Sequence, residues 1–150
     1  MDAASGRKDD RTMKKLLITS LALLAASFLA VSAYAAERTF TVNMSGKAET
    51  PKGDPNGTGK ATIKIEQSKG ELCFTLSWSR IGTPVAAHIH KGRKGVAGPV
   101  VIPLFGGAAK HKGCVKASKS LLGKIVKSPA SYYVNVHTQA FPAGAIRAQL

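Results

Sequence analysis

The chain has 150 residues, and its 22 lysines and arginines against 8 acidic residues give a formal net charge of +14 at pH 7. This length excludes a large multidomain enzyme and leaves room for one domain. So basic a chain attracts anions, but its lysines are dispersed and lack the interleaved aromatic side chains that stack bases. We therefore expect no specific nucleic-acid binding.

The first 35 residues are typical of a cleaved export signal. Lys14 and Lys15 precede an apolar run over residues 16–31, and Ala33-Tyr34-Ala35 fits the small-x-small cleavage pattern. The run is shorter than the roughly twenty residues that a spanning helix needs. Translation from Met13 is an alternative start, because the residues before it include aspartates that suit a signal poorly.

Cleavage would leave residues 36–150 as a single domain without a transmembrane segment. This part carries 17 basic and 5 acidic residues, a formal charge of +12. We expect it in the periplasm or outside the cell. The basic side chains form one tight cluster, at Lys91, Arg93 and Lys94.

Short alternating runs predict β-strands in the first half of this domain. Phe40–Met44 and Thr62–Glu66 each place apolar side chains on one face, and the loop between them, Glu49–Gly59, is rich in Gly, Pro and Asn. After a turn at Ser68–Glu71, the run Leu72–Trp78 has the clearest pattern of a core strand, because every second residue is large and apolar.

The second half continues with strands and one helical connection. The predicted strands are Val85–His90, Pro99–Leu104, Tyr132–His137 and Ala145–Leu150. Between them, Leu121, Leu122, Ile125 and Val126 have helical spacing, with Ser118 or Ser120 as the cap and Pro129 as the stop; an irregular connection is the alternative. The sequence predicts an all-β fold, an antiparallel Greek-key sandwich or barrel with one short helix.

Two cysteines lie in the predicted exported part, Cys73 and Cys114. In an oxidising compartment, an even pair in a small domain predicts a disulfide. The alternative is that one thiolate joins histidines in a metal site, as in blue-copper proteins.

The histidines are the most informative feature. His88 and His90 are two residues apart on a predicted strand, so their side chains share a face, and His137 ends another strand. Each histidine alone is explained by a surface or hydrogen-bonded position. Together the three predict a metal site, with Tyr133 and Asn135 on the same strand face as His137.

Three further residues are candidates with two interpretations each. Glu49 is a ligand or an outer partner that fixes a histidine tautomer, and otherwise a loop carboxylate. His111 lies in a basic, flexible loop, where solvation is expected over ligation. Arg147 could attract a small anion, or pack its stem across the sheet as a surface residue.

Ligation by imidazoles alone favours copper, and less strongly zinc, over calcium or manganese.

At these residues the chain resembles the CHRD family, a domain named for its occurrence in chordin and found in exported bacterial proteins. The resemblance covers nearly all of residues 36–150, in the stretches Ser45–Pro51, Ala86–Gly92, Gly95–Val101, Gly113–Val115, Tyr132–Thr138 and Phe141–Leu150. The His-x-His strand is also similar to that of copper-zinc superoxide dismutases. The resemblance implies His88, His90 and His137 as copper ligands and Arg147 as the residue that steers superoxide.

The zinc-binding loop of those dismutases has no counterpart in the sequence, so a copper-only site is expected. The resulting hypothesis is an exported copper protein that dismutates superoxide. One alternative is a non-catalytic module that stores or delivers copper. The other is a structural or adhesive envelope domain whose lysines hold an anionic polymer.

Overall fold

The computed structural model describes residues 37–150, and the predicted export signal lies outside the described residues. This part of the chain forms eight strands, most of them from alternating apolar runs, and one α-helix. They are β1 (Glu37–Ser45), β2 (Thr58–Glu66), β3 (Glu71–Ser79), β4 (Pro84–Lys91), β5 (Val100–Gly106), β6 (Lys112–Lys116), α2 (Lys119–Lys127), β7 (Tyr132–Thr138) and β8 (Ile146–Gln149). Short 3₁₀ turns follow β1 and β2 and precede β7.

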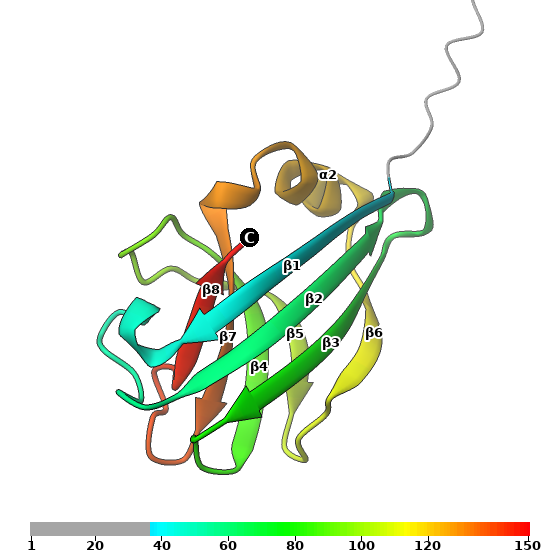
Figure 1. Cartoon of the computed structure of the whole chain (residues 1–150). Helices are drawn as coiled ribbons and strands as arrows, with labels where there is room; N and C mark the ends of the chain where they lie inside the picture. The colour runs from blue at the N-terminus through cyan, green and yellow to red at the C-terminus, as the bar shows by residue number, and fades with distance from the viewer. Residues whose placement is uncertain (1–36) are drawn as a thin grey trace, which may run out of the picture. The chain divides into compact units, whose positions relative to one another are not determined.

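The strands form one antiparallel sheet in the order β5-β4-β7-β8-β1-β2-β3-β6. The edge strands β5 and β6 contact each other, so the sheet curls into a nearly closed barrel (Figure 1). Around this closure, β6, β5 and β4 are consecutive neighbours and β7 returns to the other side of β4, which is a Greek key. The predicted all-β fold is confirmed.

The core fills the inside of the curled sheet. Leu72, Phe74 and Leu76 point inward from β3 as the alternation predicts, and Trp78 packs at the margin of this core. On β4 and β7, Ala87, Ile89, Val134 and Val136 are fully buried. The alternate residues of these two strands, which include the histidines, therefore lie on the outer face of the barrel.

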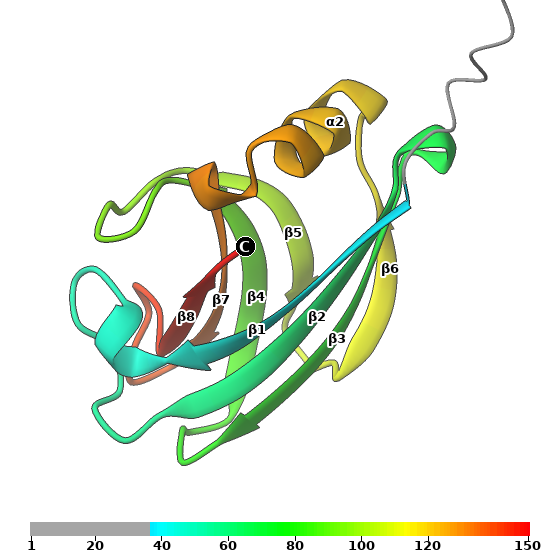
Figure 2. The same cartoon turned by 45° about the horizontal axis from the view of Figure 1, so that its top comes forward.

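The predicted helix is present as α2, and its cap is Ser118. The Ser118 hydroxyl accepts a hydrogen bond from the Leu121 backbone N–H at 3.2 Å, while Ser120 lies inside the helix. Leu122 and Ile125 are completely buried, so α2 covers the end of the barrel at the β2–β3 turn (Figure 2). No helix formed by residues 37–150 has the length and apolar character needed to span a bilayer.

Strand β6 was not predicted from the sequence. The stretch around His111 reads as a flexible basic loop because lysines and a glycine leave little alternation, yet Lys112–Lys116 pairs with β3. Its apolar side chain, Val115, is only partly buried. Pairing with the strongly patterned β3, rather than its own composition, makes this segment a strand.

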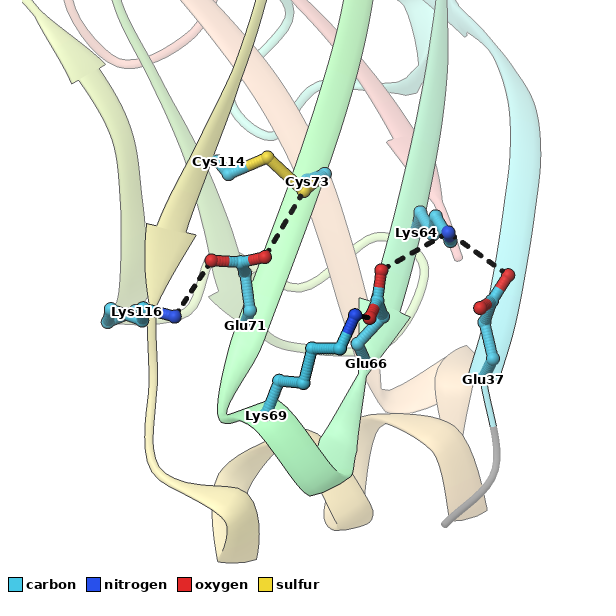
Figure 3. The surroundings of a disulfide bond; sticks show 8 residues. All are labelled: Glu37, Lys64, Glu66, Lys69, Glu71, Cys73, Cys114 and Lys116. Carbon is cyan, nitrogen blue, oxygen red and sulfur yellow. Dashed lines mark hydrogen bonds and ion pairs between the residues drawn. A yellow bond between two sulfur atoms is a disulfide. The ribbon is translucent and has the colours of Figure 1, made fainter. Parts of the chain in front are cut away.

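The predicted disulfide is confirmed between the directly paired residues Cys73 and Cys114 (Figure 3). Surface ion pairs surround it on the outer face. Lys116 Nζ lies 2.8 Å from Glu71 Oε2 across the same strand pair, and Lys64 bridges Glu37 and Glu66 at 3.2 Å each. Exposed ion pairs of this kind contribute at most about 1 kcal/mol each, so the covalent link is the stronger constraint on edge strand β6.

Replacing Cys73 and Cys114 together by serine should lower the free energy of unfolding by about 4 kcal/mol, from the entropy of closing a loop of 41 residues in the unfolded chain. Urea unfolding of the double variant and of the oxidised parent would measure the difference. A change below about 1 kcal/mol would show that the disulfide does not restrain the unfolded chain as this account requires.

Candidate metal centre

The register of three strands brings the predicted site residues together. On the outer face, His88 of β4 is opposite Asn135 of β7, and Asn135 is opposite Arg147 of β8. In the adjacent row His90 is opposite Tyr133. Side chains directly opposite each other on one face of a sheet are in contact. His137 lies in a third row, opposite Ala86, so the site is made by three rows of side chains across β4, β7 and β8.

Strand β4 pairs irregularly with β5 where it carries the histidines. Its pairing with β5 shifts register between Ala87 and His88 and again between Ile89 and His90, while the pairing with β7 is continuous from Ala86 to Lys91. Bulges of this kind turn side chains away from the regular pleat and are frequent beside functional sites. Here the extra residues, Leu104 and Val101, lie on β5, so β4 keeps its regular register with β7 and His88 and His90 keep their shared face.

The three imidazoles converge. His88, His90 and His137 each offer a ring nitrogen, and these atoms all lie within 4.8 Å of one another. His88 Nδ1 is 3.0 Å from His137 Nε2. Two nitrogens that bind one ion at about 2.0 Å are roughly 3 Å apart, so this spacing fits both a shared ion and, without an ion, a hydrogen bond between the rings.

Backbone carbonyls fix the tautomers of two of the rings. His90 Nδ1 is 2.8 Å from the Gly98 carbonyl oxygen, and His137 Nδ1 is 3.0 Å from the Pro142 carbonyl oxygen. A carbonyl oxygen only accepts, so both Nδ1 atoms carry the proton and donate. In each neutral ring the Nε2 lone pair is then left for the site, and His90 Nε2 is buried without any protein partner.

Asn135 places a further donor atom beside His137. Its Oδ1 is 3.0 Å from His137 Nε2, and the residue is fully buried. An amide oxygen and an imidazole lone pair do not bond to each other. Either a cation lies between them or the amide is turned so that Nδ2 donates, and in both cases Asn135 acts directly on His137.

Glu49 lies behind Asn135, on the loop after β1, and is 5% exposed. Burial raises the pKa of its carboxyl, while the Asn135 amide, the Thr50 N–H and the positive charge of Arg147 act against this rise. The carboxyl packs on Gly144, where a Cβ atom would collide with Glu49 Oε1 and where φ is +138°. Glu49 is thus fixed next to the site but is not one of the converging ligand groups.

Arg147 and Tyr133 form the other wall of the site. Arg147 is 1% exposed, so it is not the surface residue that one interpretation of the sequence required. Its guanidinium lies 3.3 Å from the centre of the Tyr133 ring, and its Nη atoms donate to the carbonyl oxygens of Arg93 and Val96, each at 2.9 Å. These donors face the β4–β5 loop rather than an anion.

His88 forms the accessible side of the site. It is half-buried, whereas His90 and His137 are each only 8% exposed. Burial, together with the neighbouring His137 and His90, lowers the pKa of His88 to about 4. Burial also lowers the pKa of His137. The imidazoles of His88 and His137 are therefore neutral at pH 7, which is the form that binds a metal ion.

His111 is not brought to this site. Its ring stacks on Trp78 with the ring centres 4.1 Å apart, and its Nδ1 donates to the Leu76 carbonyl oxygen at 3.0 Å. A second group of potential ligands in the described residues contains Glu71, Cys73 and Cys114. Its two sulfur atoms are joined in the disulfide, and a disulfide lacks the thiolates that bind metals.

The sequence pattern predicted side chains that the structure brings together, but it did not predict the backbone groups that orient them. Gly98 and Pro142 supply carbonyl oxygens, and Gln149 ties the loop by donating from Nε2 to the Gly92 carbonyl oxygen at 2.7 Å. Only closeness along the chain could have suggested these two carbonyls, because Gly98 lies eight residues after His90 and Pro142 lies five residues after His137.

Comparison with known proteins gives one family. The CHRD domain family matches residues 40–150, which include every residue of the site. No curated protein and no solved structure matches the chain.

The low pKa of His88 predicts a pH-dependent stability of the metal-free protein. Below pH 6.5 the unfolded chain takes up a proton at this residue, whereas the folded protein does so only near pH 4. Stability should therefore fall as the pH is lowered from about 6.5 to about 4. Thermal unfolding in this range should show a smaller fall for His88→Gln than for the parent.

The titration of Glu49 does not affect this comparison between the parent and His88→Gln. Its raised pKa acts in the opposite direction, but it is present in both proteins and cancels in their difference. Identical pH profiles for the parent and His88→Gln would contradict the buried, neutral state of His88.

Proposed function

This chain belongs to the CHRD domain family, and on that premise we propose that it is an exported copper-binding protein that dismutates superoxide. The metal ligands in this proposal are His88, His90 and His137. Residues 36–150 form the exported domain after removal of the signal, in the periplasm or outside the cell. The disulfide supports an oxidising compartment, where such bonds persist.

One observation carries the proposal: two Nδ1 atoms are held by backbone carbonyls while the Nε2 atoms point into the site. Histidines that bind metals usually donate their other ring N–H to a carboxylate, a carbonyl or water, because this fixes the tautomer and the ring orientation. His90 Nε2, buried and without a protein partner, is costly unless something binds it. A metal ion would remove that cost.

The donor set favours copper. All three converging ligand groups are imidazoles, which suit copper and zinc, whereas calcium and manganese prefer carboxylate and carbonyl oxygen. Bound copper would supply the one-electron chemistry that superoxide dismutation requires. Zinc would suit the same ligands, but it has no redox chemistry and therefore does not fit the proposed activity.

The protein's own residues supply access and charge. His88, which is less buried than His90 and His137, would give a molecule as small as superoxide access to the site. Three exposed cations lie close by: Lys91 at the end of β4, and Arg93 and Lys94 on the loop that folds over the site. A local positive potential raises the concentration of anions, so we assign attraction of superoxide to these three residues.

A second function is favoured by Asn135. Its Oδ1 lies 3.0 Å from His137 Nε2 and could act as a fourth donor. A site closed by four donors would bind copper tightly and leave superoxide no position, which is the behaviour of a storage or delivery protein. Glu49 would support either site by orienting Asn135, without itself being a ligand.

The purified protein should bind one copper ion per chain and scavenge superoxide. The double variant His88→Ala, His137→Ala removes two of three ligands. It should lower copper affinity by more than about 100-fold, beyond the 10- to 100-fold typical of losing an outer partner. Metal analysis, competition with a chelator and a superoxide-scavenging assay measure these effects. His111→Ala, outside the site, is the matched control and should keep both properties.

The outcomes separate the candidate functions. Superoxide scavenging that persists in the double variant would rule out His88 and His137 as part of the active site. Copper binding without turnover would instead establish the storage or delivery function. Failure to bind any transition metal at micromolar concentration would leave an envelope module whose histidines hydrogen-bond across the sheet and whose lysines hold an anionic polymer.

A further inference from the structure

Arg147 is a buried cation. A charged side chain is almost never fully buried unless it is paired, and Arg147 is 1% exposed. Its guanidinium donates to the carbonyl oxygens of Val96 and Arg93 at 2.9 Å and to Gln149 Oε1 at 3.3 Å. The buried carboxyl of Glu49 is the anion close enough to influence its pKa. The cost of burying this charge is thus offset mainly by contacts with one loop.

That loop, Gly92–Gly98, is folded tightly back over β4. A Cβ atom at Gly98 would collide with the Lys91 carbonyl oxygen, and one at Gly92 would lie 2.9 Å from the Val96 carbonyl oxygen. Gly95 has φ of +77°, a conformation that favours glycine. A segment with this much glycine is costly to order, so its shape depends on groups outside it.

The same loop holds a metal-ligand candidate. The Gly98 carbonyl oxygen accepts the hydrogen bond from His90 Nδ1 at 2.8 Å, and the Gly98 N–H donates to the Tyr133 hydroxyl at 3.2 Å. The first route from Arg147 to His90 therefore runs through the loop backbone, from the carbonyls of Arg93 and Val96 to that of Gly98.

A second route runs through a stack of three side chains. The Tyr133 ring lies nearly parallel to the His90 imidazole, at 9° with the centres 4.7 Å apart. Arg147 lies 3.3 Å from the centre of the Tyr133 ring. Because β7 is between β4 and β8 in the sheet, His90 and Arg147 lie on opposite sides of the Tyr133 ring. Tyr133 is held between the guanidinium and the imidazole.

We infer that Arg147 is a positioning residue: it fixes the Gly92–Gly98 loop and the Tyr133 ring, and through them the orientation and tautomer of His90. This inference rests on the proposed function, in which His90 is a copper ligand. The role needs the planar fork of arginine, because two carbonyl oxygens and an aromatic face are engaged at once. Lysine has the charge but neither the fork nor the plane.

The test compares Arg147→Gln and Arg147→Lys with the parent. In the metal-free proteins, NMR would follow exchange with water of the His90 and His137 Nδ1–H protons, and hydrogen exchange would follow the amides of the loop. In both variants the His90 proton and the loop amides should exchange at least about tenfold faster. The His137 proton, held by Pro142 outside this loop, should be unchanged and is the internal control.

The copper-loaded proteins supply a second readout. Both variants should release copper to a chelator about tenfold faster, the lower end of the effect of losing an outer partner of a ligand. Their copper(II) electron paramagnetic resonance spectra should also differ from that of the parent. Leu122→Ala, in the core beneath α2, lowers stability without touching the loop and should leave both copper properties unchanged.

Three results would overturn the inference. The first is equal acceleration at His90 and His137, which would mean general loosening. The second is full restoration by Arg147→Lys, which would mean that charge alone acts. The third is unchanged His90 exchange in Arg147→Gln. If the parent binds no copper, the proposed function fails, while the measurements on metal-free protein still decide the role of Arg147.

Discussion

Two hydrogen bonds to backbone carbonyls organise the candidate metal centre. His90 donates from Nδ1 to Gly98 and His137 donates from Nδ1 to Pro142. These bonds decide which nitrogen of each ring keeps a lone pair, and hence that the Nε2 atoms face the site. Without them, three neighbouring histidines would be a polar cluster with no preferred direction. The metal chemistry proposed for this protein depends on this choice of tautomer.

The barrel provides the rigidity that these bonds require. Inward residues of β4 and β7, such as Ile89 and Val134, are completely buried, so the strands cannot rotate to release the histidines. The outer face carries the polar rows, and loops cover it: the β4–β5 loop supplies Gly98 and the β7–β8 loop supplies Pro142. Both faces of the sheet are therefore used, one for stability and one for the site.

The sequence predicted much of the fold and most of the site's side chains because both depend on alternation. The pattern of Leu72–Trp78 and the two-residue spacing of His88 and His90 are local signals. Strand β6 and the roles of Arg147 and His111 were not predictable in this way. They depend on register and on loop closure, which bring Arg147 next to Tyr133 and place His111 against Trp78. Backbone carbonyls leave no signal in residue types at all.

The most direct measurement for the central claim is a crystal structure of the copper-loaded protein with anomalous scattering at the copper edge. The account predicts one strong peak bonded to Nε2 of His90, Nε2 of His137 and a ring nitrogen of His88. The Nδ1 atoms of His90 and His137 should remain on the Gly98 and Pro142 carbonyls. A copper peak at His111, or copper bound through Nδ1 of His90 or His137, would contradict the account.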